Sequence, residues 1–187
     1  MIFNYTTSVK GGHQQPNNSL SLGGYKSSSI VKNDDLNNLF DEISLYGMSE
    51  GKTEYRAIMF TNTTPAPMNN VKLYVEKIGE PFCEFAINIT STVKDPEGND
   101  WMERVQDVFS RPIMGDFKNL PTKEDPITIE SIEPNEVIGI WVQRTINRKK
   151  VRDEYDNVAV KSQEHIRRYV SVEKDREEGY SLIMEWD

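Results

Sequence analysis

Two stretches decide the fold: Tyr55-Arg-Ala-Ile-Met-Phe-Thr-Asn62 and Val137-Ile-Gly-Ile-Trp-Val-Gln-Arg-Thr-Ile146. Both are rich in β-branched and aromatic residues, which favour strands. Both are bounded by Gly, Asn, Pro or charged residues, which favour turns. The first stretch places apolar groups on both of its faces, so it predicts a central strand that is covered on both sides over part of its length. The chain is therefore expected to be mostly β.

Shorter apolar alternations between turn signals predict further strands. They cover residues 71–78, 82–89, 127–132 and 180–186, and Val158 and Val160 mark another short strand. Strands of about eight residues that are separated by turns are typical of a sandwich or barrel. We therefore expect one antiparallel β-sandwich domain over residues 25–187.

Three segments depart from this pattern. Residues 1–24 are polar and rich in Ser, Asn, Gln and Gly, which predicts either an extended N-terminal arm ordered by a neighbour or a disordered tail. Residues 34–43 carry apolar residues at helical spacing after an Asp, and they predict a short helix or a pair of turns. Residues 94–126 form a long insertion of the kind that is often functional, with a helical turn expected at 101–109. We expect Trp101, Phe109 and Phe117 to pin this insertion to the sandwich.

The composition favours protein partners. The 187 residues include 22 basic and 30 acidic ones, and the net charge is −8. Nucleic-acid binding requires a basic footprint, so no direct nucleic-acid partner is expected. The first residues do not resemble a secretory signal, and no apolar run reaches the length of a membrane helix, so we expect no membrane partner and folding in a reducing cytoplasm.

Few residues point to chemistry. Cys83 is the lone cysteine and lies in an apolar run, so it is expected to be a small buried hydrophobe. His13 and His165 do not form a zinc motif. The acidic cluster at 95–100 has neither the residue order nor the bidentate Glu of a calcium loop. No nucleophile elbow, Walker loop or dinucleotide fingerprint is present. We therefore expect no enzyme activity, no metal and no cofactor.

Six side chains are candidate assembly contacts: Arg56, Arg144, Arg148, Lys149, Lys150 and Trp101. Arg56 and Arg144 each lie in an otherwise apolar strand, and a buried guanidinium must be paired. Either could form a salt bridge across an assembly contact, but we favour a solvent-facing position with the stem on a neighbouring aromatic ring. The basic cluster at 144–152 could dock an acidic partner, although a solvated surface loop is the simpler interpretation.

Four motifs occur in an order that resembles tailed-phage virion proteins, including those of crAss-like phages. They are Leu22-Gly23-Gly24, Leu39-Phe40-Asp41, Gly51-Lys-Thr-Glu-Tyr55-Arg56 and Ile140-Trp141-Val-Gln-Arg144, and the resemblance spans about residues 20–146. It implies an Ig-like β-sandwich that serves, without enzymatic activity, in the capsid, neck or tail. The implied partners are other virion proteins and further copies of the chain, as a homo-oligomer or ring, in a virion assembled in the host cytoplasm.

A second class of function stays open. A β-sandwich can also be a glycan- or receptor-binding module, with an aromatic platform formed by Trp101, Tyr25 or Tyr74. A structural subunit should co-sediment with intact particles at fixed stoichiometry. A glycan-binding module should bind sugar saturably as an isolated monomer.

Overall fold

A computed structural model of the protein describes residues 2–11, 18–32, 38–41, 51–78, 83–146 and 179–187. These residues form strands and one 3-10 turn, η1 (Asn18–Leu20). The strands are β1 (Ile2–Thr7), β2 (Gly23–Ile30), β3 (Thr53–Thr61), β4 (Met68–Ile78), β5 (Cys83–Ser91), β6 (Val93–Lys94), β7 (Asp100–Arg104), β8 (Lys118–Asn119), β9 (Ile127–Ile132), β10 (Val137–Ile146) and β11 (Gly179–Glu185). The chain is mostly β, as predicted.

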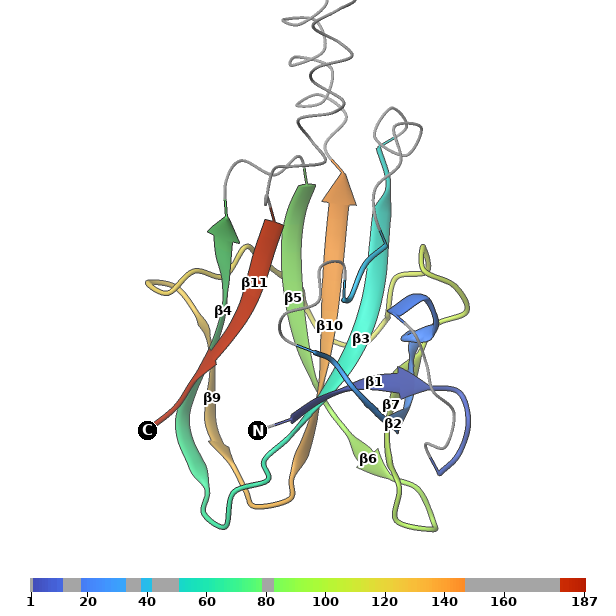
Figure 1. Ribbon diagram of the computed structural model, residues 1–187, viewed down its shortest axis with the longest axis vertical. Helices are drawn as coiled ribbons and strands as arrows, with labels where there is room; N and C mark the ends of the chain where they lie inside the picture. Colours follow the sequence, from blue (N-terminus) through green and yellow to red (C-terminus); the bar gives the residue numbers. More distant parts are fainter. Residues whose placement is uncertain (1, 12–17, 33–37, 42–50, 79–82, 147–178) are drawn as a thin grey trace, which may run out of the picture.

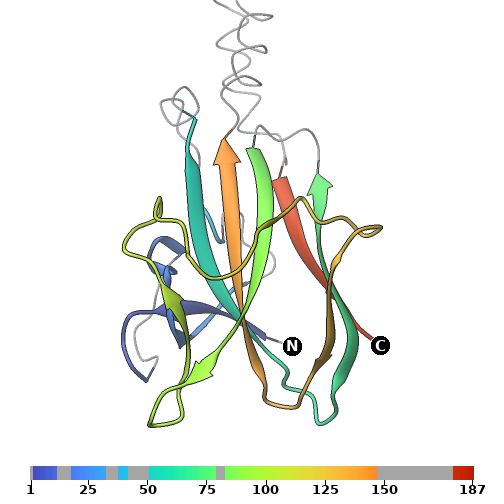
Figure 2. The ribbon, with the colours of Figure 1, turned by 180° about the vertical axis from the view of Figure 1, so that it is seen from behind.

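The strands form two antiparallel sheets that pack against each other. The larger sheet has the order β6-β7-β2-β1-β3-β10-β5-β8, and the smaller sheet has the order β11-β4-β9. In Figures 1 and 2, β3, β10 and β5 run side by side next to the smaller sheet, while β1, β2 and β7 lie to one side. The predicted strands at 71–78, 82–89, 127–132 and 180–186 correspond to β4, β5, β9 and β11, whereas Val158 and Val160 lie outside the described residues.

The central position predicted for residues 55–62 is confirmed, because β3 lies inside the larger sheet, with β1 on one side and β10 on the other. Strands β3 and β10 pair in unbroken antiparallel register from Val137 opposite Thr61 to Thr145 opposite Thr53. Ile58 and Phe60 of β3 point into the core between the two sheets. Alternate residues of the same strand enter a second apolar cluster on the other face of the larger sheet. Both faces of β3 are therefore covered, which explains why successive residues of this strand are apolar on both faces.

The core between the sheets is formed mainly by branched aliphatic residues from both layers. The larger sheet contributes from β3, β5 and β10, and the smaller sheet contributes from β4, β9 and β11. Its buried members are Phe40, Ile58, Phe60, Met68, Val71, Leu73, Val75, Ile87, Ile132, Ile138, Ile140, Val142 and Met184. Cys83 is also buried, as expected.

The second cluster explains how the N-terminal region joins the domain. Trp141, Met59 and Met102 are fully or almost fully buried there, with Leu22 packed against them. On the central strand, the Ala57 amide donates to the Ser21 carbonyl. The segment before β2 therefore satisfies backbone groups of β3 as well as covering its side chains.

The beginning of the chain differs from the expected arm. Residues 2–7 form β1, which pairs with β3 from Ile2 opposite Thr61 to Tyr5 opposite Ile58, and with β2 on its other side. Thr6 and Ser21 are fully buried, and the Thr6 amide donates to the Ser21 hydroxyl at 2.9 Å. Polar composition favours an arm, but small hydroxyl side chains can be buried when they bond to backbone and to each other. Residues 12–17 lie outside the described residues.

Gly23 and Gly24 allow β2 to approach its neighbours closely. Both have positive φ, of 84° and 97°. A Cβ on Gly23 would overlap the Glu103 carbonyl of β7, and one on Gly24 would meet the Thr7 carbonyl of β1. The register of β2 against β7 shifts between these two glycines. The Leu-Gly-Gly motif is therefore a bulge that only glycine can form here.

The insertion at 94–126 is partly regular. Residues 100–104 form β7 rather than the expected helical turn, because they pair with β2 and β6. Phe117 packs against Tyr55 with ring centroids 5.6 Å apart, as expected of an anchor. Phe109 is 54% exposed and does not anchor the loop. The helix predicted at 34–43 lies mostly outside the described residues, and residues 38–41 form a bend.

Candidate functional site

Arg144 is bonded within its own sheet. It lies directly opposite Glu54 in the register of β10 and β3. Its Nε donates to Glu54 Oε2 at 2.9 Å, and a second guanidinium nitrogen contacts the same oxygen. Its Nη1 donates to the Asp41 carbonyl oxygen at 2.9 Å. Arg144 therefore ties the bend at 38–41 to the central strands.

Arg56 completes this group. Its Nη2 lies 3.6 Å from Asp41 Oδ2, and its Nη1 donates to the Tyr55 carbonyl at 3.3 Å. Both guanidinium groups lie over the ring of Phe40, at 4.6 Å for Arg144 and 5.9 Å for Arg56. Such contacts are favourable because the ring face is electron-rich, and more so where water is excluded. Phe40 thus joins the inter-sheet core while its ring contacts two cations.

Arg56 and Arg144 are only 4% and 7% exposed, so the solvent-facing position that we favoured is wrong for both. The sequence pattern predicts correctly that both arginines lie in strands. It does not reveal that Phe40 and Asp41 cover their side chains. Burial lowers the pKa of Arg56, and the carboxylates of Asp41 and Glu54 oppose that effect. The group holds two cations and two carboxylates and is electrically balanced. Its physical effect is to fasten one segment to another, because a buried cation must keep its partners.

Three of the four motifs meet in this group. Leu39-Phe40-Asp41 supplies the ring and the carboxylate, Tyr55-Arg56 supplies one guanidinium, and Arg144 supplies the other. From the sequence, the two arginines are candidate contacts and Phe40 is only part of a motif, and Glu54 is not singled out. Strand register is the signal that could have found Glu54, because residues directly opposite on paired strands contact each other.

The other candidate residues are not brought to this group. Trp101 lies in β7, opposite Tyr25 of β2 on one side and Val93 of β6 on the other. Arg148, Lys149 and Lys150 lie outside the described residues, and so does Arg152. The assembly role of all six candidates stays a prediction.

A second feature, which the sequence did not indicate, is the loop that joins β7 to β8. Its residues Ile113 and Met114 are 91% and 57% exposed. The Glu103 carboxylate accepts the Ile113 amide at 2.7 Å and the Met114 amide at 2.9 Å. The buried Asn88 donates its side-chain amide to the Met114 carbonyl at 2.7 Å. Two apolar side chains are therefore presented to solvent on a backbone that is held by three polar contacts; we call Ile113 and Met114 the apolar tip.

Gly115 is required at this tip. Its φ is 84°, and a Cβ there would overlap the side-chain amide of Asn88. The glycine thus lets the loop turn directly over the residue that holds it.

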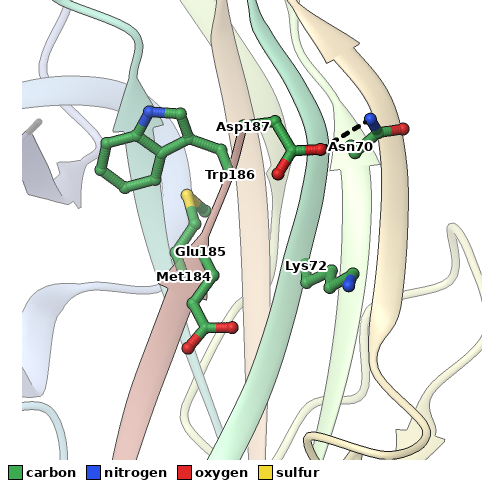
Figure 3. A pocket seen from close by; sticks show the side chains of 6 residues that line it. All are labelled: Asn70, Lys72, Met184, Glu185, Trp186 and Asp187. Atoms are coloured by element: carbon green, nitrogen blue, oxygen red, sulfur yellow. Dashed lines mark hydrogen bonds between the residues drawn. The ribbon is translucent and has the colours of Figure 1, made fainter.

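A shallow hollow of about 390 Å³ lies at the end of β11, beside β4. Figure 3 shows Met184 and Trp186 on one side of it and Lys72, Asn70 and Asp187 on the other. Asn70 Nδ2 donates to Asp187 Oδ2 at 2.9 Å. Glu185 also lines this hollow, and the hydrogen bonds that it accepts from Lys123 and from the Tyr74 hydroxyl lower the pKa of its carboxyl group.

Neither a metal cluster nor a membrane span occurs in the part of the chain that the structure describes. Among those residues, no three His, Cys, Asp or Glu side chains are grouped so that they could hold a metal ion. In the same residues, no helix is long and apolar enough to cross a membrane.

Comparison with known proteins gives no match: no family model, no curated protein and no solved structure is similar to this chain.

Proposed function

We propose that this protein is a non-enzymatic structural subunit of a tailed-phage virion, built on an Ig-like β-sandwich and acting through protein–protein contacts. The observation that carries the contact role is the apolar tip. The virion setting rests on the resemblance of the four ordered motifs, three of which meet around Phe40. Its place would be as an auxiliary capsid, neck or tail component, made in the host cytoplasm and then incorporated into the particle.

The apolar tip fits a contact role because its conformation is held before binding. Covering a large aliphatic side chain contributes about 1.5 to 3 kcal/mol. Ordering a loop on binding would offset part of this gain, but Glu103 and Asn88 already hold the backbone of Ile113 and Met114. A partner with an apolar pocket would therefore gain most of the burial energy.

The experiment is incorporation into particles. Purified particles should contain the chain at fixed stoichiometry. The Ile113→Asp variant should be depleted several-fold, because a buried carboxylate is costly at a contact. Ile30→Asp is the matched control, since Ile30 is 53% exposed on β2 and away from the tip. A chain missing from particles would contradict the virion role, and equal incorporation of both variants would contradict the role of the tip.

One observation favours the alternative, a glycan- or receptor-binding module. Tyr25 and Trp101 lie directly opposite each other on β2 and β7, so they share one face of the sheet, and both are partly exposed. Adjacent aromatic rings on a sheet face can stack on a sugar. Tyr74, in contrast, is buried and donates its hydroxyl to Glu185 at 2.9 Å. Saturable sugar binding by the isolated chain, lost in Trp101→Ala, would favour this alternative.

A further inference from the structure

The strand β11 lies at one edge of the smaller sheet. Among the described residues it pairs with β4 alone, in unbroken register from Gly179 opposite Ile78 to Glu185 opposite Lys72. It has no bulge, no Pro and no Lys, and Glu185 is its one charged residue. A bulge, a Pro or an inward Lys normally protects an edge strand, because the outer backbone groups of such a strand can pair with another strand.

The two faces of β11 differ in character. Tyr180, Leu182 and Met184 point toward the core between the sheets. Ser181 and Ile183 alternate with them and are partly exposed on the outer face. An added strand would therefore have to continue an apolar inner face and a mixed outer face.

We propose that β11 pairs antiparallel with β11 of a second copy of this chain, across a two-fold axis at Leu182, and so joins the two smaller sheets. This register pairs all seven residues of each strand. Tyr180 then lies opposite Met184 of the second copy, which continues the inner face. Ser181 lies opposite Ile183 of the second copy on the outer face, and Glu185 lies opposite Gly179. No like charges face each other, and every apolar inner residue meets another.

Other registers fit less well. A shift of the pairing by one residue would place the inner residues of one strand opposite the outer residues of the other, and so send apolar groups to the wrong face. A shift of the axis by one residue, to Ser181 or Ile183, leaves the ends of both strands unpaired. Because a two-fold contact uses the same surface on both copies, the edge needs only to be complementary to itself.

This inference deepens the proposed function and rests on it for its biological setting. It leaves the apolar tip available for a different protein, since the loop between β7 and β8 lies on the opposite side of the molecule from β11 (Figures 1 and 2). The β11 dimer and the virion role can be contradicted independently. The dimer is tested with the purified chain alone, whereas the virion role is tested with purified particles.

The experiment compares two double variants that differ only in charge pattern. Since residue 181 faces residue 183 of the second copy, Ser181→Lys with Ile183→Lys places like charges opposite each other twice. Ser181→Lys with Ile183→Glu places opposite charges there. Neither residue belongs to the inter-sheet core, and near-ultraviolet circular dichroism checks that both variants fold.

Analytical ultracentrifugation of the full chain, from about 1 µM to about 1 mM, measures self-association over the range of weak and moderate dimers. The wild type should form a dimer. The like-charge variant should bind at least about tenfold more weakly, and the opposite-charge variant should match or exceed the wild type. A wild type that stays monomeric throughout, or two variants with equal dimer affinity, would overturn the proposal.

Discussion

Arg144 and Glu54 lie directly opposite each other on β10 and β3, and their ion pair is nearly closed to solvent. Their side chains are 8% and 17% exposed. The pair is held in place by strand register, since the same register also aligns the core residues of both strands. Through the bond from Arg144 to the Asp41 carbonyl, the pair reaches a segment far away in sequence.

Removing one partner of this pair should destabilise the fold. Glu54→Gln leaves the Arg144 guanidinium buried without its carboxylate, and we expect a loss of about 3 kcal/mol in the free energy of unfolding. Arg144→Met should cost a similar amount, since it also removes the contact with Phe40. The double variant that combines Glu54→Gln with Arg144→Met should cost clearly less than the sum of the two single losses. Urea unfolding of the four proteins measures this coupling, and strictly additive losses would contradict it.

The same variants separate stability from assembly. If Arg144→Met folds at working temperature and enters particles as the wild type does, Arg144 has no role in assembly beyond the fold. Reduced incorporation of a folded Arg144→Met protein would indicate that the segment fastened by Arg144 takes part in a contact.

The bulge at Gly24 should be far less tolerant than another glycine of similar conformation. Gly24→Ala places a Cβ against the Thr7 carbonyl, and we expect a loss of more than about 3 kcal/mol. Gly98 has a φ of 86° but open space around the place where a Cβ would lie, so Gly98→Ala should cost only about 1 to 2 kcal/mol of backbone strain. Thermal unfolding of both variants gives the comparison. Equal losses would mean that conformation alone, and not close approach, requires glycine at 24.

The apolar tip should loosen when its acceptor is removed. In Glu103→Ala the Ile113 and Met114 amides lose the carboxylate that binds them, and a bond to a charged group contributes about 1.5 to 3 kcal/mol. We expect hydrogen exchange at these two amides to accelerate about tenfold or more. Glu130→Ala, at an exposed position of β9, should leave them unchanged. Unaltered hydrogen exchange in Glu103→Ala would show that the conformation of the apolar tip does not depend on the Glu103 carboxylate.

Acid should affect the turn at 95–99 only at low pH. Burial raises the pKa of Asp95, but bonds from Asn99, the charge of Lys10 and the Glu97 amide outweigh that effect and bring it to about 2. Because the folded pKa is depressed, the carboxylate stabilises the fold above its unfolded pKa of about 3.9, and this contribution fades as the pH falls toward 2.

Asp95→Asn tests this prediction. The stability difference between wild type and variant should be constant above about pH 4 and should shrink between about pH 4 and pH 2. Nuclear magnetic resonance titration of the Asp95 carboxyl group gives its pKa directly. A carboxyl that titrates at about pH 4, its ordinary range, would show that these contacts do not hold the charged form.

The central strands could be predicted from the sequence because their signal is local. The β-branched and aromatic residues of 55–62 and 137–146 indicate two strands, and apolar groups on both faces of residues 55–62 place that strand at the centre. The prediction that Arg56 and Arg144 are exposed to solvent was wrong because the pattern is only local. Alternation assigns a face, but Phe40 and Asp41, which cover that face, come from another segment of the chain.

The sequence by itself determined that this protein is mostly β, that β3 is a central strand covered on both sides over part of its length, and that Cys83 is buried. Only the tertiary structure decided that β1 belongs to the larger sheet, that three motifs meet around Phe40, and that Glu103 and Asn88 hold the apolar tip. The physical reason is the distance along the chain between the residues that interact. Strand propensity and alternation act between neighbours in sequence, whereas Glu54 with Arg144 and Asn88 with Met114 become neighbours only when distant strands pair and loops close over them.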